Sequence, residues 1–200
     1  MVRIWLVRHG QSGGQTREEG GVDPGLTELG KRQAERLAEP LSAIPVDRIL
    51  ISPLKRVWQT FERSTATAPR MAFDSRLIEH ADGVPSPYEA ILPVVPPDIA
   101  EPDTQDAWRA HSSDRARNLM ADLLGLTETS VMLFGHCGLF SILCRVFMDI
   151  DPAHKPVGAQ MDNAGISLLA LKDDGRRILE IWNDRSHVID LLQDPYGFHL

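Results

Sequence analysis

The sequence contains few of the features that mark secreted, membrane-spanning or disulfide-stabilised proteins. Only two of its 200 residues are cysteines. Cys137 and Cys144 lie in a segment predicted to be helical, in which their spacing separates the Cα atoms by about 10 Å, too far for a disulfide bond. No apolar run is long enough to span a bilayer, and the short apolar start is followed at once by Arg and His, so no signal peptide is expected. These absences predict a cytoplasmic protein without a membrane partner.

Positive charge is also scarce in this chain. The 21 Lys and Arg residues are outnumbered by 28 Asp and Glu residues, which gives a formal net charge of −7 at pH 7. Sequence-independent binding of nucleic acid needs a basic face, so no nucleic-acid partner is expected. Any anionic ligand must be captured by a local cluster of Arg side chains. The length and the 42% hydrophobic content favour a single domain over residues 1–200, large enough to fold without a disulfide or a metal.

Apolar segments typical of β-strands alternate with segments of helical period. The predicted strands are residues 2–7, 47–51, 71–74, 130–134, 164–171 and 177–182, and the predicted helices are residues 28–41, 54–61, 108–124 and 139–148. This alternation predicts an α/β fold, a three-layer α/β/α sandwich with a mostly parallel central sheet. Residues 81–104 are rich in proline and are predicted to form an insertion over the rim of the sheet.

Three of the predicted strands are followed by side chains suited to an anionic ligand. Arg8 and His9 follow the first strand, Arg56 lies in the first turn of the helix after the second, and His136 follows strand 130–134. Ligands of open α/β sheets bind in the crevice beyond the carboxyl ends of the strands. We therefore expect these four side chains to meet at one rim of the sheet.

Local turn chemistry supports that placement. Gly10 is expected to let the chain bend after His9, because glycine tolerates dihedral angles that other residues avoid. Ser52 is predicted as the N-cap of the helix that carries Arg56, with Pro53 in its first turn, where the missing N–H costs nothing.

Five motifs occur in a fixed order along the chain. They are Arg8-His9-Gly10-Gln11-Ser12, Leu26-Thr27-x-x-Gly30-x-x-Gln33-Ala34, Ser52-Pro53-Leu54-x-Arg56-x-x-Gln59-Thr60, Leu77-x-Glu79-x-x-x-Gly83 and Gly135-His136-x-Gly138. In content and order they resemble the histidine phosphatase superfamily, also called the phosphoglycerate mutase-like family, and they cover most of the chain. The resemblance implies the phosphoglycerate mutase-like form of the α/β/α sandwich.

The resemblance also implies a metal-independent phosphomonoester hydrolase that needs no cofactor and acts on a small-molecule phosphate ester. His9 would attack phosphorus and carry it as phosphohistidine, and Glu79 would protonate the leaving group. The residues implied to contact the phosphate are Arg8, Arg56, His136, Ser12 and Gln15. A phosphomonoester carries a charge of about −1.5 to −2 near neutral pH, which two guanidinium groups roughly balance.

Two further expectations concern the surroundings of the phosphate. The helix that follows His136 would favour the same anion with its N-terminus. A carboxyl group held near phosphate, as implied for Glu79, should have its pKa raised by the like charge.

Two departures from the family pattern bear on the function. Many members have Asn at the position of Gln15, whose longer amide can still donate to phosphate. The mutase branch carries a Phe-x-Gly-Trp stretch after the first loop and an Arg-x-Tyr-Gly stretch after the acid, and residues 20–24 and 79–83 match neither. A phosphatase is therefore favoured over a cofactor-dependent mutase-type isomerase, which stays open beside a non-catalytic phosphate-binding protein.

Other questions are left open by the sequence. Asp74, Asp82 and Glu89 are alternatives to Glu79 as the general acid. A zinc hydrolase that uses two His and Glu79 as ligands is disfavoured, because two arginines aimed at the same point would repel the cation. A homodimer is compatible with the sequence, and neither the oligomeric state nor the identity of the phosphate ester is decided by it.

Overall fold

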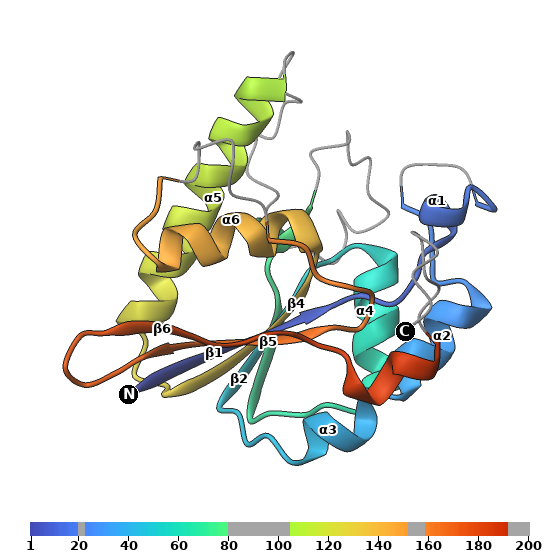
Figure 1. Ribbon diagram of the computed structural model, residues 1–200, viewed down its shortest axis with the longest axis horizontal. Coiled ribbons are helices and arrows are strands. Elements are labelled where there is room, and N and C mark those ends of the chain that lie inside the picture. The colour runs from blue at the N-terminus through green and yellow to red at the C-terminus, as the bar shows by residue number, and fades with distance from the viewer. Residues whose placement is uncertain (20–22, 80–104, 152–158, 192–200) are drawn as a thin grey trace.

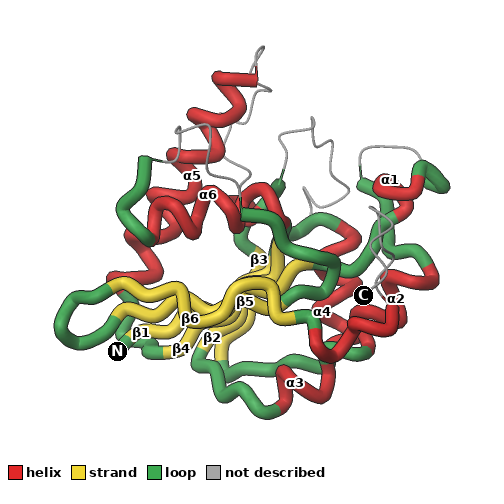
Figure 2. The backbone as a smooth tube through the Cα atoms, viewed as in Figure 1, coloured by secondary structure: helices red, strands yellow, loops and turns green. Residues whose placement is uncertain are grey.

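The computed structural model describes residues 1–19, 23–79, 105–151 and 159–191, with the backbone alone for residues 105–111. Its centre is a six-stranded sheet in the order β3-β2-β4-β1-β5-β6 (Figures 1 and 2). The strands are β1 (Val2–Arg8), β2 (Arg48–Ile51), β3 (Arg70–Phe73), β4 (Ser130–Gly135), β5 (Ile166–Leu171) and β6 (Arg177–Asp184). Neighbouring strands from β3 to β1 pair in parallel, and β5 pairs antiparallel with both β1 and β6. The predicted mostly parallel sheet is confirmed.

Helices cover both faces of the sheet (Figure 1). They are α1 (Gly13–Thr16), α2 (Glu28–Glu35), α3 (Ala38–Ser42), α4 (Lys55–Ser64), α5 (Gln105–Gly125) and α6 (Cys137–Phe147), with 3-10 turns η1 (Ser75–Leu77) and η3 (Ser186–Leu191). Leu6 of β1 packs in one buried cluster with apolar residues of α5 and α6, whereas Val7 packs in a second with those of α3 and α4. Successive side chains of a strand point to opposite faces, so the two clusters form the two interfaces of the predicted three-layer sandwich.

The predicted helix over residues 28–41 is wrong in its extent, because the structure divides it into α2 and α3. Pro40 lies inside α3 and has no N–H to donate to the carbonyl of Arg36, so the regular helical ladder cannot run through this point. The hairpin of β5 and β6 is confirmed. The predicted insertion at residues 81–104 lies outside the described residues. Within the described ranges, no helix is both long enough and apolar enough to cross a membrane.

The predicted N-cap at Ser52 is also wrong. The helix begins later, at Lys55, with Leu54 as the N-cap residue and without a side-chain cap from it. Asp23 takes that role from the preceding loop, since its two carboxylate oxygens accept from the N–H of Lys55 at 2.9 and 3.0 Å. The N–H of Ser52 instead donates to the carbonyl of Phe134 at 3.0 Å, continuing the pairing of β2 with β4.

Gly10 is required for space rather than for an unusual dihedral angle, contrary to expectation. Gly175, in the hairpin turn, is the glycine of the described ranges that has a positive φ. A Cβ atom on Gly10 would lie 2.4 Å from the carbonyl oxygen of Gly30 in α2. The loop after β1 therefore packs directly on the backbone of α2, and this contact fixes the direction in which the chain leaves the sheet.

Candidate active site

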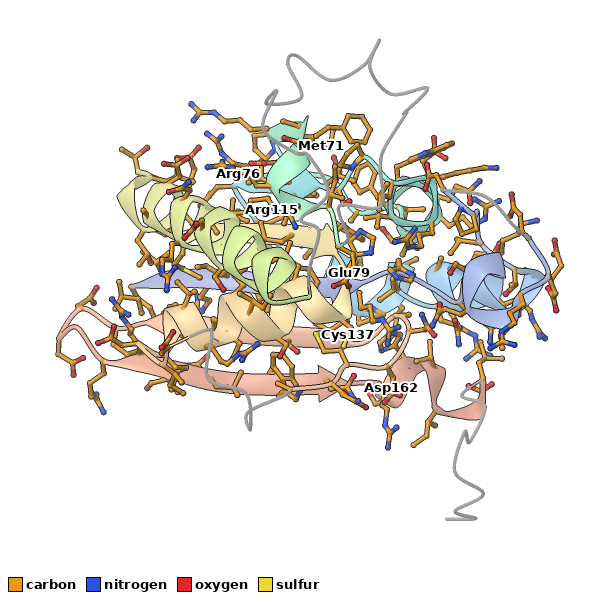
Figure 3. The ribbon with its side chains drawn as sticks, turned by 90° about the horizontal axis from the view of Figure 1, so that it is seen from above. Met71, Arg76, Glu79, Arg115, Cys137 and Asp162 are labelled. Atoms are coloured by element: carbon orange, nitrogen blue, oxygen red, sulfur yellow. The ribbon has the colours of Figure 1, made fainter. Side chains whose placement is uncertain are left out.

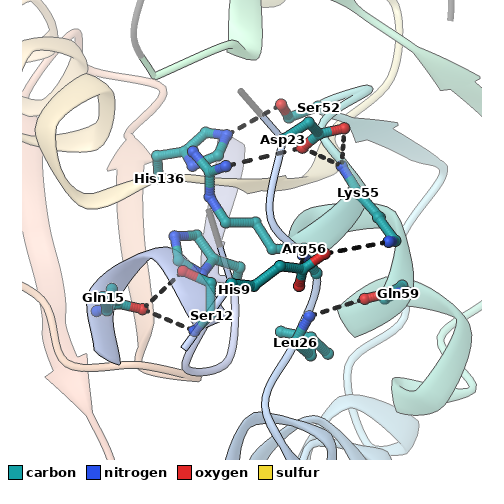
Figure 4. A network of polar contacts seen from close by, with 12 residues as sticks. His9, Ser12, Gln15, Asp23, Leu26, Ser52, Lys55, Arg56, Gln59 and His136 are labelled. Carbon is teal, nitrogen blue, oxygen red and sulfur yellow. Dashed lines mark hydrogen bonds and ion pairs between the residues drawn. The ribbon is translucent and has the colours of Figure 1, made fainter. Parts of the chain in front are cut away.

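Four side chains predicted from the motifs are brought together beyond the carboxyl ends of β1, β2 and β4. Arg8 is the last residue of β1, His9 follows it, His136 directly follows β4, and Arg56 lies in the first turn of α4 after β2. The rings of His9 and His136 have their centroids 5.1 Å apart in an edge-on arrangement. Both rings lie in the field of the two guanidinium groups, which help to lower the pKa of each histidine. Figure 4 shows His9, His136 and Arg56 facing one another.

His9 is held with one ring nitrogen anchored to the backbone. Its side chain is buried, and Nδ1 lies 2.6 Å from the carbonyl oxygen of Gly10. A carbonyl oxygen can only accept, so Nδ1 carries the proton and Nε2 keeps its lone pair. Burial, followed by the positive charges of Arg56 and Arg8, lowers the pKa of His9 well below its usual value. The ring is therefore neutral near pH 7, which is the form in which an imidazole can act as a nucleophile.

The two guanidinium groups are anchored by different parts of the chain. The Nη1 atom of Arg8 donates to the carbonyl oxygen of Met161, in the loop before β5. The Nη1 atom of Arg56 lies 3.8 Å from a carboxylate oxygen of Asp23, and both of these side chains are largely buried. Asp23 is a site residue that the sequence analysis missed. Its position in the loop was visible, but its contact with α4 joins residues more than 30 positions apart.

His136 is fully buried and bonds through Nε2 to the hydroxyl of Ser52, with the two atoms 3.0 Å apart. Its Nδ1 atom is buried and has no hydrogen-bond partner among the described residues. Burial is the main cause that lowers the pKa of His136 well below its usual value, and the charge of Arg56 adds to it. Two neutral imidazoles and two guanidinium groups therefore share one buried region.

Glu79 lies at the N-terminus of α6 (Figure 3), where its carboxylate oxygens accept from the N–H groups of Gly138 at 2.9 Å and Leu139 at 3.0 Å. The helix N-terminus that we expected to bind phosphate is therefore occupied by Glu79 at these two donors, because an unpaired N–H attracts any nearby anion. Burial raises the pKa of Glu79, and the two N–H groups oppose that shift. Burial by the protein thus raises this pKa before any phosphate is bound, and the added effect of a phosphate stays a prediction.

The contact between Glu79 and α6 also explains why the second glycine of the motif Gly135-His136-x-Gly138 is a glycine. A Cβ atom on Gly138 would lie 2.0 Å from Oε1 of Glu79. Any larger residue at this position must displace the carboxylate. The sequence motif thus records the close approach of Glu79 to α6.

Of the alternatives to Glu79 as the general acid, the structure describes only Asp74, and it places this residue in other contacts. The carboxylate of Asp74 accepts from the backbone N–H and the guanidinium group of Arg76, which also pairs with Asp122 of α5. Asp74 is thereby engaged in a separate ion-pair network. Asp82 and Glu89 lie outside the described residues. No group of three His, Cys, Asp or Glu side chains in the described ranges is arranged to hold a metal ion, so the zinc alternative gains no support.

Ser12 and Gln15 mainly order the loop after β1. Gln15 Oε1 accepts from the backbone N–H of Ser12 at 3.0 Å, and its amide exchanges hydrogen bonds with the amide of Asn163 at 3.1 and 3.2 Å. Asn163 also donates to the carbonyl oxygen of His9 at 3.0 Å. A direct contact of Ser12 or Gln15 with phosphate stays a prediction.

Arg115 of α5 is a second residue that the sequence analysis missed. It is 7% exposed, and its Nη1 atom donates to the carbonyl oxygen of Ile78 at 2.8 Å. Its positive charge acts on both Glu79 and His136. A signal was present in the sequence, since Arg115 precedes the buried Leu119 by one helical turn and therefore lies on the apolar face of α5.

Comparison with known proteins identifies the family. The family model described as histidine phosphatase superfamily (branch 1) matches residues 4–185. The chain belongs to this superfamily. It is 28% identical over 214 aligned residues to glucosyl-3-phosphoglycerate phosphatase of Mycobacterium tuberculosis, with 93% of this chain and 96% of that protein covered. It is 40% identical over 87 residues to phosphoserine phosphatase 1 of Hydrogenobacter thermophilus, where the match spans 42% of this chain and only 41% of that relative.

Solved structures of other proteins show the same fold. A mycobacterial glucosyl-3-phosphoglycerate phosphatase in complex with VO3 superposes with a TM-score of 0.67 at 26% identity, covering 92% of this chain and all of that one. Bacillus stearothermophilus YhfR gives a TM-score of 0.70 at 20% identity, with 94% of this chain and 100% of that chain covered. The predicted phosphoglycerate mutase-like fold is confirmed.

Proposed function

We propose that this protein is a phosphomonoester hydrolase that acts through a phosphohistidine on His9. The observation that carries the proposal is the anchoring of His9, whose Nδ1–H bonds to the carbonyl of Gly10 and leaves the Nε2 lone pair as the nucleophile. The nearby Arg8 and Arg56 supply the two positive charges that a phosphomonoester requires. Relatives over most of the chain's length are named phosphatases, which supports the same reading.

In the first half of the reaction the two guanidinium groups and His136 hold the phosphoryl oxygens and orient phosphorus for in-line attack. A bond forms between Nε2 of His9 and phosphorus while the bond from phosphorus to the ester oxygen breaks. Glu79 gives its proton to the departing alkoxide. The raised pKa of Glu79 favours the protonated form that this step needs. Because the arginines neutralise the phosphate, no step requires a metal.

In the second half the phosphohistidine is hydrolysed by water. Glu79, now ionised, takes a proton from the water as its oxygen attacks phosphorus, and the bond from phosphorus to Nε2 breaks. His9 returns to its neutral form and orthophosphate leaves. The same carboxyl group therefore serves as acid and then as base, which restores the starting state.

The substrate belongs to the class of small-molecule phosphate esters. The decisive experiment screens a panel of such esters, including phosphoserine and glucosyl-3-phosphoglycerate, against the wild type and His9→Ala. Release of phosphate by the wild type and its loss in His9→Ala are expected. Cys137→Ala is the matched control for the neighbouring nucleophile and should keep its activity. Turnover that persists in His9→Ala would reject the proposal, and binding of the esters without turnover would favour the non-catalytic alternative.

A mutase-type isomerase is tested in the same preparation. Interconversion of 3-phosphoglycerate and 2-phosphoglycerate faster than hydrolysis of either would favour the isomerase over the hydrolase.

For the compartment, we propose the cytoplasm. The support is that the chain has only two cysteines, which do not form a disulfide, so no bond in the described residues calls for an oxidising compartment.

A further inference from the structure

Ser52 is not the N-cap residue that its position before Pro53 suggested. It is fully buried and does not cap α4. Its backbone N–H bonds to Phe134 of β4, and Ile51 and Phe134 are paired in the parallel register of β2 and β4. Adjacent strands therefore deliver Ser52 and His136 to the same rim, where the hydroxyl meets the imidazole (Figure 4).

The hydrogen bond between Ser52 and His136 can be formed in two ways. Either the hydroxyl donates to an unprotonated Nε2 of His136, or Nε2–H donates to the hydroxyl oxygen. Among the described residues, Nε2 is the partner that the structure gives for the Ser52 hydroxyl. In the second arrangement the hydroxyl proton would find no acceptor in the described part of the chain, and leaving a buried donor unpaired is costly. The first arrangement satisfies both atoms.

The same choice decides what the other nitrogen of His136 presents to a ligand. With Nε2 accepting, Nδ1 carries the proton of the neutral ring. Nδ1 is buried, has no partner among the described residues, and belongs to a ring that lies close to His9, Arg8 and Arg56. A lone pair on Nδ1 would repel a phosphoryl oxygen, whereas an N–H group would bind it.

We infer that Ser52 is a positioning residue, which donates its hydroxyl proton to Nε2 of His136 and thereby fixes the tautomer whose Nδ1–H donates to a phosphoryl oxygen. This inference rests on the proposed function in one respect, the identity of the phosphoryl oxygen as the acceptor of the Nδ1 proton. The hydrogen bond between Ser52 and His136 does not depend on the proposed function, because it is present without ligand.

The two histidines then have the same tautomer but opposite roles. His9 is anchored through Nδ1–H and presents the lone pair of Nε2 to phosphorus. His136 is anchored through Nε2 and presents the proton of Nδ1 to oxygen. Because His136 is buried beside two cations, it does not present a proton by becoming an imidazolium ion near neutral pH. A neutral ring can donate reliably only if its tautomer is fixed, and Ser52 is the side chain placed to fix it.

The experiment compares Ser52→Ala, which removes the hydroxyl, with Ser52→Thr, which keeps it, and with Ser64→Ala as a control. Ser64 is a fully buried serine at the end of α4, and its hydroxyl donates to the carbonyl of Phe61 and accepts from the N–H of Ala66 just beyond the helix. Long-range ¹H–¹⁵N NMR of the ligand-free protein reports which ring nitrogen of His136 is protonated, with the signal assigned through His136→Gln. Activity is measured in parallel as kcat/KM for a phosphomonoester.

We expect the wild type, Ser52→Thr and Ser64→Ala to have His136 protonated at Nδ1, and Ser52→Ala to lose this preference. Activity should fall about 10- to 100-fold in Ser52→Ala, the range found when a residue that orients a metal-binding histidine is removed. Ser52→Thr should recover most of the activity. If Ser52→Thr does not fold, the tautomers of the wild type and of Ser52→Ala still decide.

Protonation of the wild-type ring at Nε2 would overturn the inference, as would a tautomer that Ser52→Ala leaves unchanged. These outcomes are distinct from a failure of the proposed function. A protein with the expected tautomer and no phosphatase activity would reject the function, and an active phosphatase with the other tautomer would reject only the role of Ser52.

Discussion

Replacing Gly138 by alanine tests the placement of Glu79 without changing the Glu79 residue itself. In a helix, Gly→Ala ordinarily stabilises the fold by about 0.5–1 kcal/mol. Here the new Cβ would lie 2.0 Å from Oε1 of Glu79, so the carboxylate must move away from the N-terminus of α6. In the proposed mechanism, the displaced Glu79 then no longer delivers its proton to the leaving group.

The size of the effect follows from the step that is lost. General acid catalysis contributes about 10²- to 10⁴-fold to the rate, which corresponds to about 2.7–5.4 kcal/mol of barrier. We expect kcat/KM of Gly138→Ala to fall by this factor for an alkyl phosphate, whose alkoxide must be protonated. With p-nitrophenyl phosphate the loss should be less than about 10-fold, because that leaving group departs without a proton.

The assay compares both substrates across Gly138→Ala, Glu79→Gln and the double variant. Both single changes remove the same group, so the double variant should lose about as much as either one. Gly125→Ala is the matched control, because a Cβ at that position of α5 meets nothing within 4 Å. Equal losses on the two substrates, or losses that multiply in the double variant, would refute the assignment of Glu79 as the acid.

Three further predictions follow from the charged contacts. Because Glu79 must be protonated to act, kcat/KM for alkyl phosphates should fall as pH rises through its raised pKa, and a flat profile over that range would contradict its role. Asp23→Ala removes the acceptor of the Lys55 N–H, so urea unfolding should show a loss of about 0.5–2 kcal/mol, whereas unchanged stability would count against the cap. The hydrogen bond from Arg48, together with Arg70, lowers the pKa of Glu128 to about 2, so the stabilisation is complete above the ordinary value of 4.5 and disappears as pH falls towards 2. The Tm advantage of the wild type over Glu128→Gln should shrink over this range, and a difference independent of pH would oppose it.

The sequence predicts the location of the site well because parallel strands impose it. The side chains after β1, β2 and β4 follow strands that are neighbours in the sheet, so their carboxyl ends share one rim. Arg8, His9, Arg56 and His136 needed only the correct strand assignment and the motifs of the superfamily to be placed together.

The contacts that complete the site could not be predicted from local patterns. Ser52 carries every local mark of an N-cap, yet its hydroxyl bonds to a residue 84 positions away. The cap of α4 comes from Asp23 in a preceding loop, and Glu79 meets Gly138 across 59 positions. Such pairings are set by how layers pack, and a single sequence shows them only as isolated polar residues. The sequence shows a glycine at position 138, but the structure is needed to see that a side chain there would collide with Glu79.

The most direct test of the account traps the phosphoenzyme and determines which atom carries the phosphoryl group. The wild type is mixed rapidly with a phosphomonoester, quenched in alkali to preserve phosphohistidine, and analysed by mass spectrometry and ³¹P NMR. The geometry of His9, with Nδ1–H on the carbonyl of Gly10, predicts a single phosphohistidine at residue 9, phosphorylated on Nε2. A phosphoryl group on Nδ1, on His136 or on any other residue would contradict it.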